Sequence, residues 1–473
     1  MRILMVASEA APFAKTGGLA DVAGALPVAL RELGHEVAVV MPRYRSVSPD
    51  GATIAQEEMP LMVGAIPYRV RILRKEHRGV PFFFVDAPDL FVRDGGLYDN
   101  HGHEFGDNAL RFAVFSLAAL GVAQLVWRAD ILHCHDWQAA LVPVYRHDKF
   151  WSSPVFYGTK TVLTIHNLGY QGRYGKDKFW DLGLGGGWLS PDKLEYYGDV
   201  NLLKGGIMMA DALTTVSPTY AREIQTPEFG FGLDGVLRTR AHMLTGIING
   251  VDYHDWNPET DRFIASHYSE SNLSGKMECK RDLLREFGLP GAHLDRPLIG
   301  IVSRFAEQKG FDLIAGIAHE IANQDVQFVV LGSGDWRYER LFRDWAHWLP
   351  HKVGTRIGYD NKLSHKIEAG ADIFLMPSRY EPCGLNQIYS LRYGTVPVVR
   401  ATGGLDDTIQ ADTGFKFEHY TVEGLVWALR EALKEWWGDQ EAWRERMRHG
   451  MRQDFSWEAS AREYVALYQR LMG

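Results

Sequence analysis

The chain has 473 residues, too many for one ordinary domain, and this length predicts two or three domains with separate cores. Hydrophobic residues make up 46% and charged residues 23% of the sequence, as in globular proteins. The net charge of −8 excludes a broad basic field that would attract nucleic acid or an anionic membrane. Three cysteines without a CxxC pair argue against a disulfide framework and favour a reducing compartment.

No membrane segment or export signal is expected. The first residues, MRILMVAS, have the pattern of a strand, and they lack the charged, apolar and small-residue regions of a signal peptide. The longest apolar run, Phe112 to Trp127, is shorter than the roughly 20 residues that span a bilayer, and it contains Gln124. We therefore expect a buried helix there and a cytoplasmic protein.

Short apolar runs alternate with helical patterns along the chain. Near-continuous Val, Ile and Leu strands separated by helices predict an α/β fold with parallel sheets that are covered on both faces. The strands predicted in the first half are RILMVAS, EVAVVMP, PFFFVDA, DILHCHD, TVLTIHN and ALTTVS. Those predicted in the second half are LIGIVSR, QFVVLGSG, DIFLMPSR and TVPVVR.

This alternation occurs twice, which predicts two doubly wound, Rossmann-like domains. The first domain is assigned to residues 1–245. The segment GIINGVDYHDWNP, residues 246–258, is rich in Gly, Asn and Pro and is the predicted hinge. The second domain is assigned to residues 259–456. Residues 457–473 form an amphipathic closing helix that we expect to pack back on the first domain.

The informative residues follow the strands, because ligands of open parallel sheets bind beyond the carboxyl ends of the strands. Lys15, Thr16, Gly17 and Gly18 lie between the first strand and a helix. The glycines allow the backbone to approach a ligand closely, while the helix start and Lys15 provide positive charge. This combination suits a phosphate, although a plain glycine-rich turn is the alternative. Asp21, in the first helical turn, is suited to cap the helix or to accept a sugar hydroxyl.

Two other interpretations find little support. A dinucleotide fingerprint is not matched, since GLGGGW at 183–188 follows no strand and GSGDWR at 332–337 ends in Arg337 instead of glycine. His133 and His135 would point to the same face of a strand as a possible metal-ligand pair. No third or fourth ligand has useful spacing, so we predict no metal site.

Polar residues follow three other strands. Asp136 follows the HCH strand and is suited to accept a sugar hydroxyl. His166 and Asn167 end another strand; a lone histidine is more often a core residue, but its place at a carboxyl end favours function. Arg304 and Lys309 lie in one loop, where two cations can bind a diphosphate. The alternative is that they are two solvated surface charges.

The segment MPSRYEPCGLNQIYSLRYGTVPVV carries the densest set of site features. A strand ends at Met376, a loop contains Glu381 and Cys383, and a helix is expected to open at Gly384 with its N–H groups free. A second Thr-Gly-Gly-Leu turn, Thr402 to Leu405, follows the next strand. Two such sheet edges facing each other would form a cleft for an anionic ligand that bears a sugar.

The stretches KTGGLADV, HNLGYQG, SRFAEQKGFDL and SRYEPCGLNQIYSLRYGTVPVVRATGGLDDT resemble the bacterial glycogen synthases and plant starch synthases, in order along the whole chain. The resemblance implies the glycosyltransferase B (GT-B) fold, with two facing Rossmann-like domains and a deep cleft between them. It also implies a retaining hexosyltransferase that moves glucose from ADP-glucose to the non-reducing end of an α-1,4-glucan in glycogen biosynthesis. No metal or organic cofactor is implied, and the absence of a transit peptide favours the bacterial enzyme.

The resemblance also implies roles for individual residues. The backbone carbonyl of His166 would face the anomeric carbon, Arg304 and Lys309 would neutralise the diphosphate, and Glu381 would lie beside the glucose; these four are the implied catalytic residues. Tyr389 stands where the wider clan often has a second Glu, which leaves the ribose contacts open. The residues implied to bind the nucleotide sugar are Lys15, Gly17, Gly18, Asp21, Asp136, Asn167, Asn249, Cys383, Gly384 and Leu385.

Two other classes of protein share features with this sequence. A glucan phosphorylase has a similar architecture but carries pyridoxal phosphate on a lysine. A non-catalytic glucan-binding protein could use some of the 14 tryptophans as sugar platforms, but it would have no use for a diphosphate clamp. The expected partners are ADP-glucose and an α-1,4-glucan; the sequence does not exclude UDP-glucose, and it leaves open whether the protein is a monomer or a homo-oligomer.

Overall fold

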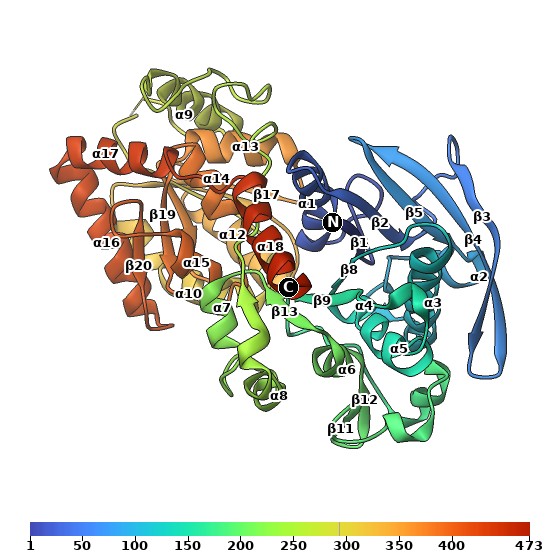
Figure 1. Ribbon diagram of the computed structural model, residues 1–473. Coiled ribbons are helices and arrows are strands. Elements are labelled where there is room, and N and C mark those ends of the chain that lie inside the picture. The colour runs from blue at the N-terminus through green and yellow to red at the C-terminus, as the bar shows by residue number, and fades with distance from the viewer. Residues whose placement is uncertain (293) are drawn as a thin grey trace. The chain divides into compact units, whose positions relative to one another are not determined.

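The computed structural model describes residues 1–292 and 294–473, and the chain divides into two compact units (Figure 1). The chain passes from the first unit to the second between Gly250 and Val251, inside the segment 246–258. The first unit comprises Met1–Val216, Ala221–Gly250 and Trp457–Gly473. The second comprises Ser217–Tyr220 and Val251–Ser456, so four residues from the last part of the first predicted domain are counted with the second unit.

The first unit is built on a nine-stranded sheet in the order β14-β13-β9-β8-β1-β2-β5-β4-β3. Strands β14 to β5 run parallel, and the β3–β4 hairpin adds two antiparallel strands. All six strands predicted in the first half are confirmed. Their bounds are β1 Arg2–Val6, β2 Glu36–Pro42, β5 Val80–Asp86, β8 Ile131–His135, β9 Lys160–Ile165 and β13 Ala212–Thr215. The sequence reading missed β3 Thr53–Val63, β4 Ile66–His77 and β14 Leu244–Gly246.

Helices follow the strands of this sheet and bury their apolar faces. Helix α1 (Gly18–Glu32) follows β1 and packs against the closing helix α18 (Trp457–Met472), which is counted with the first unit. Helix α3 (Asn108–Leu125) is long and apolar enough to cross a membrane, but 83% of it is buried inside the protein. The prediction of a buried helix in this region is confirmed.

The second unit has a six-stranded, all-parallel sheet in the order β17-β16-β15-β18-β19-β20. The four predicted strands are confirmed as β15 Leu298–Val302, β16 Gln327–Gly332, β18 Ile373–Met376 and β19 Val396–Arg400. Two strands at the sheet edges, β17 Val353–Ile357 and β20 Phe415–Phe417, were not predicted. Helices that bear on the site are α10 Phe311–Gly316, α14 Asn386–Arg392 and α15 Gly403–Thr408, with the one-turn helix η5 at Glu307–Lys309.

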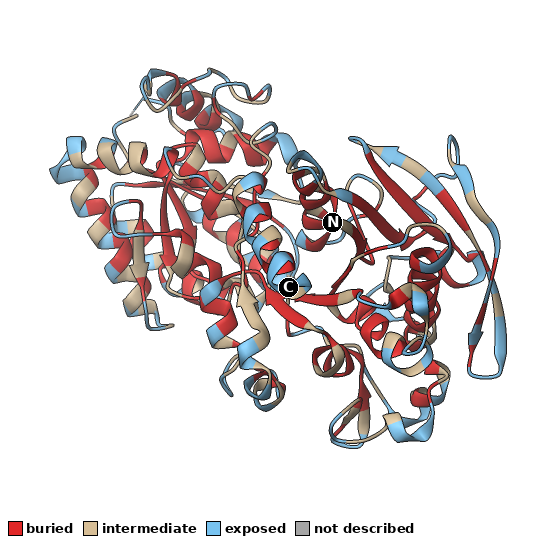
Figure 2. Cartoon of the chain, in the orientation of Figure 1, coloured by how far each residue is buried: buried red, intermediate tan, exposed pale blue. Residues whose placement is uncertain are grey.

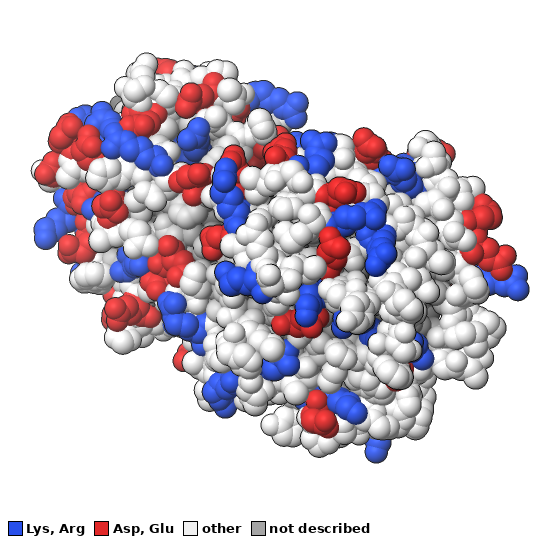
Figure 3. Space-filling model, in the orientation of Figure 1, with Lys and Arg blue, Asp and Glu red and all other residues white. Residues whose placement is uncertain are grey.

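The interior strands of each sheet are buried along most of their length, whereas much of the β3–β4 hairpin is exposed (Figure 2). In the second unit an aromatic cluster of Phe305, Phe311 and Phe342 fills the space between the sheet and its helices, with ring centroids 4.9–5.7 Å apart. On the face shown in Figure 3, positive and negative side chains are interspersed, and no broad patch of one sign is present. The carboxyl ends of the strands are therefore the place to look for a local site.

Candidate functional site

The loop after β1 leaves open space in front of its two glycines. Gly17 precedes α1 in an extended conformation, and no side chain caps the helix start. A Cβ atom added to Gly17 or Gly18 would meet no protein atom within 4 Å. Packing inside the protein therefore does not require glycine here, whereas the close approach of a ligand to the backbone would.

Lys15 and Asp21 interact with each other at this loop. The Lys15 Nζ atom lies 2.6 Å from Asp21 Oδ1, and the lysine side chain is half exposed. Asp21 does not cap α1, so the capping alternative for this residue is wrong; its charge stabilises the first helical turn through the helix dipole. Lys15 is thus presented to solvent beside a helix N-terminus.

Glu9 is a site residue that the sequence reading missed. It lies three positions after β1, is 3% exposed, and accepts hydrogen bonds from the backbone N–H and the hydroxyl of Thr16 at 2.5 and 2.8 Å. Burial raises the pKa of Glu9 to about 7, and the two hydrogen bonds from Thr16 oppose this rise. Glu9 therefore fixes the conformation of the loop that presents Lys15. A carboxylate three positions after a buried strand was the available signal.

Asp136 ties the ends of β8 and β9 together. Its backbone adopts the left-handed region with φ +57°, which is uncommon for a residue with a side chain. Its Oδ1 accepts the backbone N–H of His166 at 2.7 Å, and the N–H of Asn167 also donates to this carboxylate. Burial raises the pKa of Asp136 to about 7. The carboxylate was expected to meet a sugar hydroxyl, but in this structure it positions the backbone of His166.

The two histidines of β8 have hydrogen-bond partners inside the first unit. His135 Nδ1 lies 3.0 Å from His166 Nε2, and His133 Nε2 lies 2.6 Å from Thr164 Oγ1. Burial lowers the pKa of His166 to about 3, so its imidazole is neutral near pH 7. Within residues 1–292 and 294–473, no group of three or more His, Cys, Asp and Glu is arranged to hold a metal ion.

The predicted residues Asn167 and Asn249 have different surroundings. Asn167 Oδ1 accepts the backbone N–H of Gly169 at 2.9 Å, so this side chain shapes its own turn. Asn249 is 7% exposed, and among the described residues its Oδ1 atom has no hydrogen-bond partner. A buried amide oxygen without a hydrogen-bond partner is uncommon, so we expect a ligand or a water molecule to donate a hydrogen bond to it.

In the second unit, Lys309 and Glu381 form an ion pair. Lys309 Nζ lies 2.6 Å from Glu381 Oε2, and the Ser378 hydroxyl donates to the same oxygen at 3.1 Å. The two side chains are 21% and 7% exposed. Arg304, in the same loop as Lys309, is exposed and has no ion-pair partner in the described part of the chain. This edge of the sheet thus presents one free cation and one cation held by a buried carboxylate.

The glycines of the second Thr-Gly-Gly-Leu turn serve a different purpose from those of the first. A Cβ atom on Gly403 would lie 1.9 Å from the carbonyl oxygen of Glu381, and one on Gly404 would lie 2.0 Å from that of Cys383. The Gly404 N–H also donates to the Glu381 carbonyl at 3.1 Å. This turn therefore needs glycine to pack against the Glu381 loop and is not an open counterpart of Gly17 and Gly18.

The loop after Glu381 differs in detail from expectation. Cys383 is buried, and Gly384 has φ +73°, a conformation that favours glycine. Helix α14 begins at Asn386, with Leu385 as its N-cap, so the expected start at Gly384 is wrong by two residues. Tyr389 stacks face to face on Trp256 at 3.9 Å, which engages its ring within the second unit.

Sequence comparison matches most of the chain to two family models. Residues 2–239 match the starch synthase catalytic domain, and residues 288–450 match glycosyl transferases group 1. The glycogen synthase of Koribacter versatilis is 50% identical and covers 99% of this chain and 98% of its own. That of Myxococcus xanthus is 47% identical over the full length of both proteins. The chain belongs to the glycogen and starch synthase family.

Solved structures agree with this family assignment. The catalytic domain of starch synthase IV from Arabidopsis thaliana, solved with ADP and acarbose, is 34% identical, covers 99% of both chains and superposes with a TM-score of 0.89. A sucrose-phosphate synthase from Thermosynechococcus elongatus, at 17% identity and a TM-score of 0.62, shares the fold alone. The resemblance to glycogen and starch synthases and the GT-B fold with two Rossmann-like domains are both confirmed.

Within this family fold, all predicted site residues lie beyond the carboxyl end of a strand: Asn249 is in the loop after β14, and Asp21 is in the first turn of α1. The structure joins Lys15 to Asp21, Asp136 to His166 and Lys309 to Glu381. It adds Glu9 to the first group. The chemical roles of these residues remain predictions, and they are the basis of the function proposed below.

Proposed function

We propose that this protein transfers glucose from ADP-glucose to the non-reducing end of an α-1,4-glucan, with retention of configuration, in glycogen biosynthesis. The observation that carries the proposal is the loop cation Lys309, held 2.6 Å from Glu381, with the exposed Arg304 in the same loop. Relatives named glycogen synthase and the starch synthase solved with ADP and acarbose support the same substrates.

Arg304 and Lys309 would stabilise the departing diphosphate. As the bond between the anomeric carbon and the phosphate oxygen breaks, negative charge accumulates on ADP, and two fixed cations stabilise it without a bound ion. Glu381 would orient the glucose and favour the positive charge that develops at its anomeric carbon. We propose that neither a metal nor an organic cofactor takes part.

Retention is explained by a displacement on one face of the sugar. The acceptor 4-hydroxyl forms the new bond to the anomeric carbon on the face that ADP leaves, and its proton passes to the departing phosphate oxygen. His166 is neutral near pH 7, so its ring does not provide this proton. We propose that its backbone carbonyl, which Asp136 fixes through the adjacent N–H at 2.7 Å, faces the anomeric carbon instead.

Lys15 and its open glycine loop would contact the nucleotide sugar from the first unit. The half-exposed lysine can exchange its partner Asp21 for a phosphate, since an exposed ion pair contributes little stability. The buried side-chain oxygen of Asn249 has no partner among the described residues, and it would accept a hydrogen bond from a hydroxyl of the glucosyl unit. We propose that the reaction takes place in the cytoplasm.

The test is incorporation of labelled glucose into glycogen by the purified protein, with ADP-glucose and UDP-glucose compared in parallel. We expect incorporation from ADP-glucose, α-configured new linkages by NMR, and loss of activity in Glu381→Gln. Absence of incorporation from either donor would refute the proposal. An absorption band of pyridoxal phosphate in the purified protein would favour a glucan phosphorylase instead.

A further inference from the structure

The short stretch of chain from Thr215 to Ser217 has its two ends in different units. Thr215 is the last residue of β13 and belongs to the first unit, whereas Ser217 begins the segment Ser217–Tyr220 that is counted with the second. The chain returns to the first unit at Ala221, within α7 (Pro218–Glu223). Thr215 and Ser217 are both completely buried. A hydroxyl group in such a place needs a hydrogen-bond partner inside the protein.

The Thr215 hydroxyl holds the peptide group that precedes His166. It donates to the Ile165 carbonyl at 2.7 Å. The N–H of the same peptide group belongs to His166 and donates to Asp136 Oδ1 at 2.7 Å. Both polar atoms of this peptide group are therefore bound by side chains, and its plane is fixed where β9 ends. The next carbonyl along the chain is that of His166, to which we assign a role at the anomeric carbon.

The Ser217 hydroxyl binds the backbone of the residue that follows Glu381. It donates to the Pro382 carbonyl at 2.6 Å and accepts the backbone N–H of Tyr220 at 3.1 Å. A serine hydroxyl has a single proton, so this proton is committed to Pro382. The Gly404 N–H donates to the same carbonyl at 3.2 Å. The backbone beside Glu381 is thus held by two donors, one of which is Ser217.

Thr219 keeps Ser217 in place. The Thr219 backbone N–H donates to Asp407 Oδ2 and the hydroxyl donates to Asp407 Oδ1, both at 2.7 Å. Asp407 lies in α15, the helix that also contains Gly404. The segment is therefore bound to α15 as well as to the loop of Glu381. Hydrogen bonds to an ionised carboxylate are stronger than those between neutral groups, so this second attachment is firm.

We propose that Thr215 and Ser217 are positioning residues for glucose transfer. Thr215 fixes the backbone from which the His166 carbonyl projects, and Ser217 fixes the backbone that carries the Glu381 carboxylate. Neither hydroxyl needs to touch a substrate for this purpose. The inference rests on the proposed function, from which the roles of His166 and Glu381 come. Reacting groups must be held close to their productive positions, so loss of such a support lowers the rate more than the affinity.

The test compares Thr215→Val and Ser217→Ala with wild type in steady-state kinetics with glycogen and ADP-glucose. Each variant removes one buried hydroxyl with little change in side-chain volume. We expect kcat to fall about ten- to hundredfold, while KM for glycogen and Kd for ADP, measured by calorimetry, stay within about twofold. Thr215→Ser keeps the hydroxyl and should restore most of the rate. Thr219→Val keeps the N–H bond to Asp407 and should lower kcat less than Ser217→Ala.

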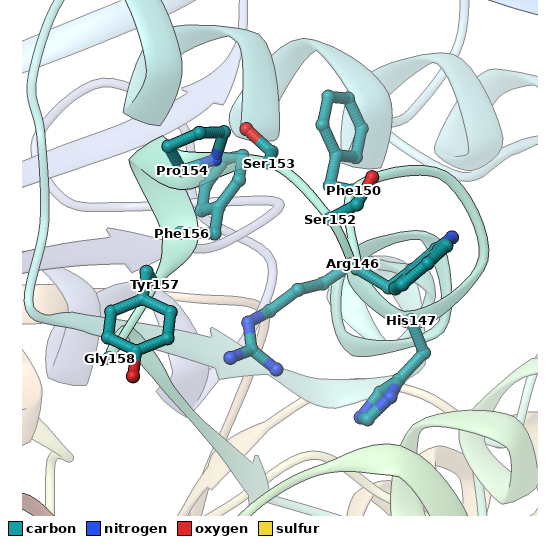
Figure 4. Close-up of a pocket in the computed structure, with 10 residues that line it drawn as sticks. Arg146, His147, Phe150, Ser152, Ser153, Pro154, Phe156, Tyr157 and Gly158 are labelled. Atoms are coloured by element: carbon teal, nitrogen blue, oxygen red, sulfur yellow. The ribbon is translucent and has the colours of Figure 1, made fainter.

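Thr159→Val is the matched control. Thr159 is 3% exposed, and its hydroxyl donates to the Ala129 carbonyl at 2.9 Å, so the same substitution removes the same kind of hydrogen bond. It lies directly before β9, next to Gly158 of the pocket in Figure 4, whereas His166 follows the other end of this strand. We expect this variant to lose stability in urea as Thr215→Val does, but to keep the wild-type kcat.

A wild-type kcat in Thr215→Val or in Ser217→Ala overturns the inference, as does an equal fall of kcat in Thr159→Val. It is also overturned if Thr215→Ser is as slow as Thr215→Val, or if KM for glycogen rises as much as kcat falls. If Ser217→Ala yields no folded protein, a wild-type kcat in Thr219→Val overturns the role of Ser217. Failure of the proposed function gives a different result, since wild type itself would then transfer no glucose.

Discussion

At the scale of single residues, the position of Lys309 depends on the glycine that follows it. Gly310 has φ +75°, and a Cβ atom there would lie 2.0 Å from the Pro377 carbonyl oxygen. The chain can therefore turn at this point, against the end of β18, only with glycine. As a result, the Lys309 ammonium group reaches Glu381, the buried carboxylate of the next loop.

Replacing Lys309 by Ala should lower kcat by about 10²- to 10³-fold, with KM for glycogen nearly unchanged. Loss of one fixed partner of the charge that develops in the transition state commonly costs about 2.7–4 kcal/mol. Arg304→Ala should act in the same direction. Steady-state kinetics with ADP-glucose measures both effects, and Lys362→Ala, at an exposed position of the same unit, is the control. Near-normal turnover in Lys309→Ala and Arg304→Ala would reject the diphosphate clamp.

Glu9 should make the stability of the protein depend on pH. Burial raises its pKa from 4.5 to about 7, so the folded state holds this proton more tightly than the unfolded state. The unfolded state binds fewer protons between these pH values, and the free energy of unfolding therefore falls as pH rises from about 4.5 to 7. Below this window the carboxyl group is neutral in both states, and above it the group is ionised in both.

The variant Glu9→Gln removes this titration while keeping the size of the side chain. Relative to this variant, wild type should lose about 1–3 kcal/mol of unfolding free energy between about pH 5 and pH 8. Urea melts of both proteins at the two pH values give the difference. An equal pH dependence in the two proteins would show that Glu9 is not buried as a neutral acid.

At the scale of helices and strands, the closing helix α18 is fixed to the first unit by buried polar contacts. The Tyr468 hydroxyl lies 2.7 Å from His133 Nδ1, and the Ser460 hydroxyl donates to the Ile248 carbonyl at 2.7 Å. Burial lowers the pKa of His133 to about 3, so the neutral ring has one donor and one acceptor nitrogen. Its other nitrogen pairs with Thr164, and the tyrosine completes its hydrogen bonding.

Tyr468→Phe should destabilise the protein by about 1–2 kcal/mol, because it leaves a buried nitrogen of His133 without a partner. The measurement is urea unfolding near pH 7. Arg462→Ala, on the exposed side of the same helix, is the control and should change stability by less than about 0.5 kcal/mol. If both variants unfold at the urea concentration of wild type, the hydrogen bond contributes nothing to the attachment of α18.

The sequence predicted the interior strands well and the peripheral ones poorly. Interior strands such as β15 are buried on both faces and appear as unbroken apolar runs. In β3 the stretch Gln56–Glu58 interrupts the apolar pattern because this strand lies at the sheet edge, and β20 has only three residues. Such segments carry too little periodic signal, and their pairing is decided by neighbouring strands that are distant in sequence.

The site was predictable as a set of residues but not as a set of contacts. Position after a strand was enough to select Lys15, His166 and Lys309. It gave no indication that Asp136 holds the backbone of His166, because these residues are 30 positions apart in the sequence. Nor did it indicate that Glu9 holds Thr16, because that contact depends on how the chain turns between them. The two Thr-Gly-Gly-Leu turns show the same limit: their sequences are identical, but only contacts distant in sequence reveal that Gly403 and Gly404 are needed for packing.

At the scale of the whole molecule, positive charge is used locally. The net charge of −8 gives the protein no general attraction for anions, and on the face in Figure 3 both signs are interspersed. Recognition of a diphosphate must then come from a few fixed cations. Arg304 and Lys309 in the second unit are the residues that we assign to this purpose.

Neutralisation of the diphosphate by a few fixed cations leads to a prediction about metal dependence. If fixed cations neutralise the leaving diphosphate, a bound divalent ion is not required. Protein dialysed against EDTA should therefore keep its rate of transfer from ADP-glucose within about twofold, and added magnesium should not raise it further. Under the same conditions Arg304→Ala and Lys309→Ala should remain slow, because a free ion does not replace a cation that the loop holds in place. Loss of activity after EDTA, restored only by magnesium or zinc, would mean that a metal ion neutralises the diphosphate and that the loop cations do not suffice.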